Sequence, residues 1–228
     1  MRVQLAVTSL AALFIAQSAR AQGNLGQSAA ETVQVEQSRA QNAALMKQYT
    51  WNERTDFMVN GQQKDLRIDL VNFGPDGKIQ RTVLNDQHSP LPGGFFRRKA
   101  AENKIKDLEK YMEGLKSALY QYTLPTPGAV MNFLNAATTV PAQNGQLMVT
   151  GQNVVQPGDS LTIWMDAATK KTQKTVVTTA FEGNPVNVTA TFATLPNGLN
   201  YVAYAEVTIP AKGYSLLIQN FNYQMNGQ

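Results

Sequence analysis

The segment YVAYAEVTIPAKGYSLLI, residues 201–218, alternates apolar and polar side chains on either side of the turn at residues 210–213. Its apolar members share one face and are Tyr201, Ala203, Ala205, Val207, Ile209, Tyr214, Leu216 and Ile218. This spacing is typical of a β-hairpin that is buried on one side only. Similar runs occupy about residues 161–165, 177–181 and 186–192. The last seventy or so residues therefore predict an antiparallel meander of about five or six strands.

Three earlier strand-like runs lie at about residues 49–59, 66–70 and 79–83. In the first run, Trp51 and Phe57 fall on the same face because side chains alternate along a strand. In the second run, the apolar alternation predicts a buried face made of Leu66, Ile68 and Leu70. The intervening charged residues predict a solvated face, made of Asp65, Arg67 and Asp69.

Residues 97–122 carry the strongest helical period in the chain. Its apolar residues recur three or four positions apart and are Ala101, Ile105, Leu108, Met112, Leu115, Leu119 and Tyr122. The stripe is narrow and the rest of the segment is charged, which predicts a helix that packs on the sheet by one side. Weaker patterns predict helices at about 30–47 and 127–137. Residues 87–96 predict a loop. After the helix predicted at 127–137, a stretch rich in Gly, Asn and Gln runs to Gly158 with no predicted strand.

Residues 1–21 read MRVQLAVTSLAALFIAQSARA and end in the cleavage-site pattern Ala19-Arg20-Ala21. This pattern predicts a secretory signal peptide, because the apolar run is too short to span a bilayer. We expect a disordered N-terminus at 22–29, followed by one domain at 30–228 with a helical insertion at about 97–137. The predicted location of the exported chain is the periplasm.

The net charge gives little information about partners. The 228 residues contain 20 Lys and Arg against 16 Asp and Glu, a formal charge of +4. Removing Arg2 and Arg20 with the predicted leader leaves 18 basic residues against 16 acidic ones, a charge of +2. The exported chain is therefore not broadly basic, and we expect no nucleic-acid partner.

Few of the usual catalytic and metal-binding side chains are present. The chain has no cysteine and one histidine, His88. Disulfides, thiolate nucleophiles and Cys-ligated metals are thereby excluded, as is any site that needs two imidazoles. No P-loop, G-x-G-x-x-G or G-x-S-x-G motif occurs. We therefore predict no enzyme activity, no cofactor and no metal.

The segment Phe95-Phe96-Arg97-Arg98-Lys99 places two aromatic and three cationic residues at the start of the long predicted helix. Cations at that end oppose the helix dipole, so stability alone does not account for them. One interpretation is contact with an anionic membrane surface or an acidic envelope protein. The other is a solvated helix end whose arginines pair with carboxylates such as Glu102.

Two short stretches and the order of the elements resemble a known superfamily. Trp164-Met165-Asp166-Ala167-Ala168-Thr169-Lys170 resembles the W-h-D-x-x-T strand and turn of periplasmic lipoprotein carriers, both the Lol-type carrier and the mycobacterial lipid carriers. Tyr49-Thr50-Trp51 with Asn60-Gly61 resembles their first strand and hairpin. No residue can be matched to the inward arginine that latches the Lol-type lid, so cargo and release mechanism are not carried over.

We expect an α+β fold, in which helices pack on the concave face of a strongly curved antiparallel sheet, or half-barrel. The resemblance implies that this concavity holds a lipid or a lipoprotein acyl chain. The residues expected to line it are Trp51, Phe57, Ile68, Ile163, Phe192, Val207, Leu216, Leu108, Met112 and Leu115. The expected function is a monomeric, non-catalytic carrier or binding protein for a hydrophobic ligand. The alternative is an envelope scaffold or interaction protein with a filled core and no ligand.

Overall fold

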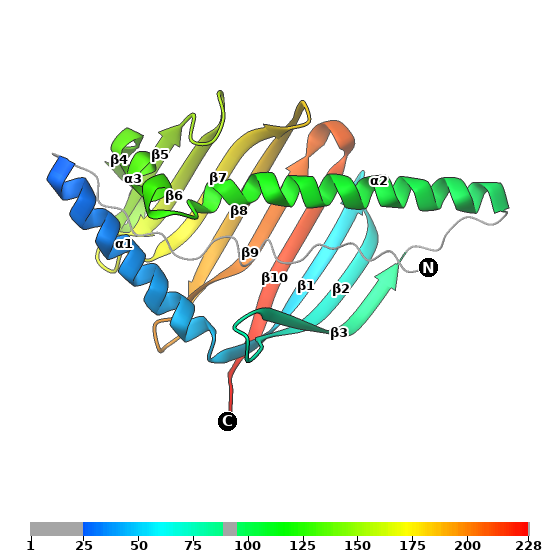
Figure 1. Cartoon of the computed structure of the whole chain (residues 1–228), viewed down its shortest axis with the longest axis horizontal. Helices are drawn as coiled ribbons and strands as arrows, with labels where there is room; N and C mark the ends of the chain where they lie inside the picture. Colours follow the sequence, from blue (N-terminus) through cyan, green and yellow to red (C-terminus); the bar gives the residue numbers. More distant parts are fainter. Residues whose placement is uncertain (1–24, 89–94, 228) are drawn as a thin grey trace.

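The structure is a computed structural model that describes residues 25–88 and 95–227 (Figure 1). Within these residues it contains three α-helices and ten β-strands, so the fold is α+β as predicted. The helices are α1 (Leu25–Met46), α2 (Phe95–Tyr120) and α3 (Pro127–Ala136), and short 3₁₀ turns include η2 (Gln121–Thr123) and η4 (Pro210–Lys212). The strands are β1 (Tyr49–Val59), β2 (Gln62–Phe73), β3 (Ile79–His88), β4 (Thr138–Pro141), β5 (Gln146–Gln152), β6 (Ser160–Asp166), β7 (Thr172–Phe181), β8 (Asn184–Thr194), β9 (Asn200–Ile209) and β10 (Tyr214–Met225).

All ten strands form one antiparallel sheet in the order β3-β2-β1-β10-β9-β8-β7-β6-β5-β4. Pairing of the first strand with the last joins the N-terminal hairpins to the C-terminal meander, so both runs of strands form one surface. The sheet is not closed, and β3 and β4 are its two edges. The hairpin between β1 and β2 turns at Asn60 and Gly61, whose φ angles of 50° and 75° lie in the left-handed region that these residue types tolerate.

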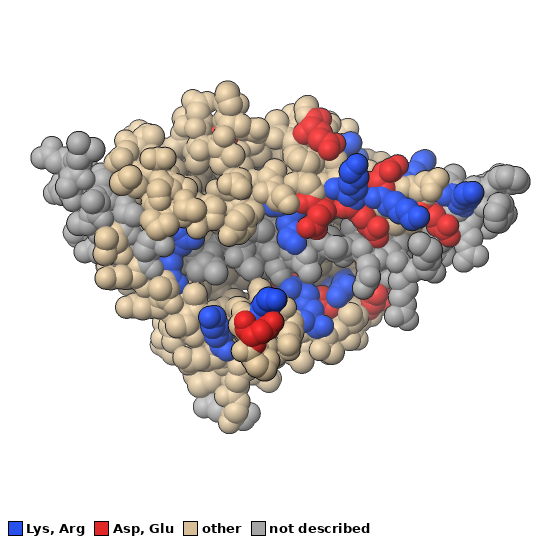
Figure 2. Space-filling view, in the orientation of Figure 1, with Lys and Arg blue, Asp and Glu red and all other residues tan. Residues whose placement is uncertain are grey.

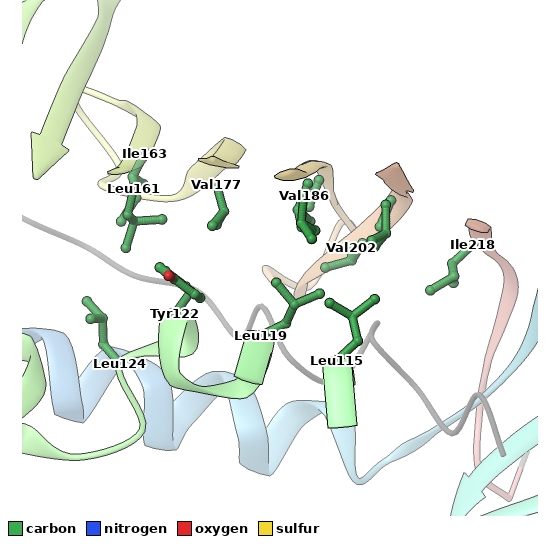
Figure 3. Close-up of a cluster of buried hydrophobic side chains, with 14 of the residues drawn as sticks. Leu115, Leu119, Tyr122, Leu124, Leu161, Ile163, Val177, Val186, Val202 and Ile218 are labelled. Atoms are coloured by element: carbon green, nitrogen blue, oxygen red, sulfur yellow. The ribbon is translucent and has the colours of Figure 1, made fainter. Parts of the chain in front are cut away.

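Helix α2 crosses the strands on one face of the sheet and buries its apolar stripe there (Figures 1 and 3). Leu115 and Leu119 are each only 1% exposed, and Tyr122 is 2% exposed. The strand residues around them are aliphatic and include Leu161, Ile163, Val177, Val186, Val202 and Ile218. Burial of one leucine side chain stabilises a fold by about 1.5–3 kcal/mol, so this apolar layer is the main attachment of α2.

Two glycines allow helices to approach the sheet closely. A Cβ atom at Gly114 of α2 would lie 2.8 Å from Cζ of Phe181 at the end of β7. A Cβ atom at Gly151 of β5 would lie 2.7 Å from Cε2 of Phe133 in α3. Carbon atoms in contact sit about 3.5–4.0 Å apart, so any larger residue at either position forces a shift.

Helix α1 is tied to the rest of the fold by hydrogen bonds to backbone groups. Asn42 donates from Nδ2 to the carbonyl of Asn200 in β9 (2.8 Å), and its Oδ1 accepts from the Asn200 N–H (2.9 Å). Arg39 donates to the carbonyl oxygens of Leu124 (2.8 Å) and Thr123 (3.3 Å), just after α2. Because Asn42 is buried, this reciprocal pair also satisfies polar groups that would otherwise be costly to bury.

The helices follow the prediction more closely than the strands do. The helices expected at 97–122 and 127–137 are confirmed, at 95–120 and 127–136. Helix α1 begins at residue 25, so residues 25–29 of the expected disordered start are helical. The predicted signal peptide lies outside the described residues. No helix within residues 25–88 and 95–227 is both long and apolar enough to cross a membrane.

Two strand predictions were wrong. Strands β4 and β5 occupy the Gly-, Asn- and Gln-rich stretch, where no strand was predicted. Strand β5 pairs with β6, and β4 pairs with β5, so backbone pairing determines their conformation although their own composition gives only a weak strand signal. Strand β3 also continues through Gln87 and His88, where a loop was predicted, because those residues pair with Leu66 and Asp65 of β2.

Candidate functional site

Most of the predicted lining residues meet in one cluster between α2 and the sheet. Those in the cluster itself are Phe57, Met112, Leu115, Ile163, Val207 and Leu216. Leu108 and Phe192 are partly buried and pack against it. Two predicted residues, Trp51 and Ile68, are not part of it. The structure therefore brings together eight of the ten positions, drawn from α2, β1, β6, β8, β9 and β10.

Trp51 belongs instead to an aromatic group near the ends of β1 and β10. Its ring stacks on Tyr223, with centroids 5.6 Å apart, and lies 6.1 Å from Phe73. Its indole N–H donates to Oδ1 of Asn220 (3.1 Å). Trp51 is 3% exposed, and the bond to Asn220 satisfies its buried N–H group. The residue therefore fits a structural role.

The predicted orientation of β2 was wrong. Phe57, on the helix-covered face, pairs with Asp65, and the same register continues to Glu53 opposite Asp69. Alternation along the strand then places Asp65, Arg67 and Asp69 on the face of Phe57, and Ile68 on the opposite face with its partner Arg54. The charged residues of β2 thus lie on the side of the sheet that was expected to be apolar.

These inward charges form a compact ion-pair cluster across β1, β2 and β3. Arg81 donates from Nη2 to both carboxylate oxygens of Glu53, at 3.1 and 3.3 Å. Its Nε lies 3.9 Å from Asp69, which also accepts from Arg67 at 2.8 Å. Glu53 is 2% exposed and Asp69 5% exposed, so both carboxylates are desolvated. The cluster gives the helix-covered face a charged sector at β1–β3 beside the apolar one at β6–β10.

Glu53 gives this cluster a testable pH dependence. Desolvation raises the pKa of Glu53 above its ordinary value of 4.5, although Arg81 opposes that shift. The folded state therefore holds this proton more tightly than the unfolded state, and the resulting stability is full below pH 4.5 and lost as the pH rises through the folded pKa. We expect Glu53→Gln, which cannot ionise, to unfold in urea with a flatter dependence on pH between 4.5 and 7.

Glu113→Gln is the matched control, because Glu113 is exposed on α2. Loss of the hydrogen bonds to Arg81 offsets the whole curve, so the slopes of the curves are compared and not the absolute free energies of unfolding. Equal slopes for Glu53→Gln and the unmodified protein would show that Glu53 is not desolvated.

A hydrogen bond between two buried side chains joins η2, which directly follows α2, to the loop between β5 and β6. Tyr122 donates to Oδ2 of Asp159 (2.6 Å), and Asp159 is 1% exposed. The same carboxylate accepts three backbone N–H bonds from Val154, Val155 and Gln156, at 2.6, 3.0 and 2.8 Å. Burial and Asp159 together raise the pKa of Tyr122. The hydroxyl therefore stays a donor, and the arrangement is a structural anchor.

The resemblance segment at β6 forms a capped turn. Oδ1 of Asp166 accepts from the N–H and the hydroxyl of Thr169, at 2.6 and 2.8 Å, and from the N–H of Ala168 at 3.1 Å. These bonds lower the pKa of Asp166. The ring of Trp164 lies 5.2 Å from Nζ of Lys174 on the neighbouring strand. The spacing of Asp and Thr in this segment thus serves to close the turn between β6 and β7.

An open pocket of about 610 Å³ lies where α2 passes the β7–β8 hairpin, η4 and the start of β10. We call it the lysine pocket, and it is lined by Lys104, Asp107, Leu108, Lys110, Tyr111, Glu182, Lys212 and Tyr214. Charged side chains gather along α2 in Figure 2. Sequence reasoning found Leu108 but missed the others, since Glu182, Lys212 and Tyr214 come from turns far along the chain.

The other predicted contacts remain predictions. Phe95–Arg98 form the first turn of α2, but their side chains lie outside the described part of the structure; Lys99 is exposed. His88 ends β3 opposite Asp65. The described residues hold no group of three or more His, Cys, Asp or Glu that could bind a metal ion.

Comparisons with known proteins give structural similarity only. No family model and no curated protein matches the sequence. The chain is similar to a solved structure of a DUF1329 family protein from Desulfovibrio piger, with 10% identity over 90% of this chain and 95% of that one and a TM-score of 0.41. It is also similar to a LolA superfamily protein from Nitrosomonas europaea, with 12% identity over 84% and 94% of the two chains and a TM-score of 0.31.

Proposed function

We propose that this chain is an exported, non-catalytic carrier or binding protein for a lipid or another hydrophobic ligand. The ligand would sit between the helices and the concave face of the sheet, with the sheet acting as a half-barrel. Lipid or lipoprotein acyl chains are the ligand class that fits an apolar layer of this kind, and the protein would act as a monomer in the periplasm.

One observation carries the proposal. The apolar layer under α2 continues to the lysine pocket, because Leu108 and Tyr214 line the pocket and also pack against the buried cluster. An acyl chain that passes the charged side chains of the pocket meets Leu108 and Tyr214 and then the apolar layer. A single helix covers this entrance, so displacement of one end of α2 would admit the chain. The volume of the pocket is within the range of ligand sites, about 300–1,000 Å³.

The first step of the test is to identify a bound ligand. The protein is purified without detergent, weighed by native mass spectrometry and extracted with organic solvent. A co-purifying lipid, or uptake of a fluorescent fatty acid, supports the carrier function. A homogeneous mass with no uptake overturns it and favours the scaffold with a filled core.

Leu108→Glu tests where the ligand enters. A carboxylate at the junction of pocket and core would have to be desolvated beside the acyl chain, which is costly. We expect fatty-acid affinity to fall by at least about tenfold, measured by fluorescence titration. Ser117→Glu is the control, because Ser117 is exposed on the same helix. Equal loss in both variants, or in neither, would exclude entry past Leu108.

A further inference from the structure

The lysine pocket gathers three ammonium groups that have no ion-pair partner among the described residues. Lys104 and Lys110 come from α2, and Lys212 comes from η4. Asp107 and Glu182 also line the pocket, but none of the five charges has an ion pair within 4.0 Å in the described part of the chain. Cations brought together around one opening attract an anion, and lysine is a common point charge for phosphate.

Tyr111, which lines the same pocket, carries a buried hydrogen-bond donor with no partner. Tyr111 is 9% exposed, and its hydroxyl is inaccessible and makes no hydrogen bond in the structure. Burial raises the pKa of Tyr111, so the hydroxyl keeps its proton. Nζ of Lys212 lies 4.6 Å from the centroid of the Tyr111 ring. A buried donor without a partner is rare in native proteins, and a ligand oxygen would satisfy it.

The pocket also has an apolar side. Leu108 and Tyr214 pack against the buried cluster, and the Tyr214 ring lies 5.5 Å from that of Phe57. The pocket thus combines charged side chains and a tyrosine with two residues that lead into the apolar layer. This pairing fits an amphiphile better than a purely apolar molecule.

We propose that the lysine pocket binds a phosphate-type oxyanion. Lys104, Lys110 and Lys212 supply the positive charge, and Tyr111 supplies a neutral hydrogen bond after a lining side chain such as Lys212 moves aside. Where the oxyanion is a lipid headgroup, this site deepens the proposed function and rests on it, since the acyl chains then follow Leu108 into the core.

Three probes distinguish the sources of the anion in calorimetric titrations of the full chain. Dihexanoyl phosphatidic acid carries both acyl chains and a phosphate monoester. Dihexanoylglycerol carries the same chains without the phosphate, and inorganic phosphate carries the anion alone. We expect the phosphatidic acid to bind at least about tenfold more tightly than the diacylglycerol, with a preference that weakens as salt concentration rises.

Variants then locate the site. Lys212→Gln is expected to weaken binding of phosphatidic acid by about tenfold. Lys106→Gln is the control and should leave affinity unchanged, because Lys106 is exposed on α2 and does not line the pocket. Tyr111→Phe separates binding from structure. It removes a donor without a partner, so the melting temperature should stay the same or rise while affinity for the phosphate falls.

The outcomes separate this site from the proposed function. Equal affinity for phosphatidic acid and diacylglycerol overturns the oxyanion site and leaves the hydrophobic carrier standing. Binding of inorganic phosphate that depends on Lys212, without lipid binding, supports the site and overturns the carrier. Failure of all three probes overturns both proposals. A parallel fall of melting temperature and affinity in Tyr111→Phe assigns the hydroxyl to the fold and overturns its role in binding.

Discussion

Asp159→Ala is expected to lower the free energy of unfolding by about 3 kcal/mol, among the largest effects of any polar substitution in this chain. The side chain accepts bonds from Tyr122 and from the backbone N–H groups of Val154, Val155 and Gln156. Asp159 is almost fully buried, so water cannot replace it as the acceptor. Chemical denaturation followed by far-ultraviolet circular dichroism measures the loss.

Asp166→Ala is the matched control for this prediction. Asp166 also accepts two backbone N–H bonds and a hydroxyl bond, from Ala168 and Thr169, but it lies at an exposed turn. Water can bond to the groups that it leaves, so the denaturation midpoint should move much less. Similar shifts of the denaturation midpoint in the two variants would mean that burial does not determine how much the hydrogen bonds of Asp159 stabilise the fold.

Leu115→Ala is expected to lower the free energy of unfolding by about 3–5 kcal/mol. Leu115 is 1% exposed at the centre of the layer between α2 and the sheet. Its truncation removes apolar burial and leaves a cavity that strands paired on both sides cannot close. Urea denaturation followed by tryptophan fluorescence measures the change in midpoint at constant slope.

Leu108→Ala provides the comparison on the same helix. Leu108 is only partly buried and borders the open lysine pocket, so solvent can fill the space that it leaves. We expect a loss of about 1–2 kcal/mol. If Leu108→Ala costs as much as Leu115→Ala, then the pocket is closed and packed in solution, and entry past Leu108 loses its support.

Helix α2 could be predicted because its information is local. The spacing of Leu108, Met112, Leu115 and Leu119 already defines one face of a helix, and burial of that face follows from it. The hairpin pattern around residues 210–213 is equally local. In α2, and in the hairpin from Ala205 to Ile218, the periodicity of the sequence and the tertiary contacts agree, and the structure confirms the prediction. Before Ala205 the predicted face of β9 was wrong, because the register with β8 shifts at Ala203 and Val202 packs in the core in place of Tyr201 and Ala203.

The face of β2 could not be predicted in this way. Leu66, Ile68 and Leu70 are more apolar than the residues between them, so alternation alone assigned the buried face to them. The register with β1 decides the matter, because Phe57 pairs with Asp65. Arg81 on β3 forms ion pairs with Asp69 on β2 and with Glu53 on β1. These pairs join three strands, so the sequence of one strand does not reveal them.

The lysine pocket was hidden for a similar reason. Lys104, Leu108 and Tyr111 lie on one side of α2, which a helical projection shows. Lys212 and Tyr214, however, belong to a turn that the sequence identified only as the end of a hairpin. These residues lie beside α2 because of the order of strands in the sheet, in which β10 pairs with β1. That order cannot be read from the turn alone.

The close approach at Gly114 has a consequence for how this protein can vary. A methyl group there would press on Phe181, whose ring lies 5.1 Å from that of Tyr111, one helical turn away. Because Phe181 contacts Tyr111, and Tyr111 lines the lysine pocket, a change in the spacing between α2 and the sheet at Gly114 also affects the pocket. We expect a methyl group at position 114 to change the size of the pocket while every residue that lines it stays the same. In the proposed carrier, the size of ligand that fits would thus be set separately from the groups proposed to bind it.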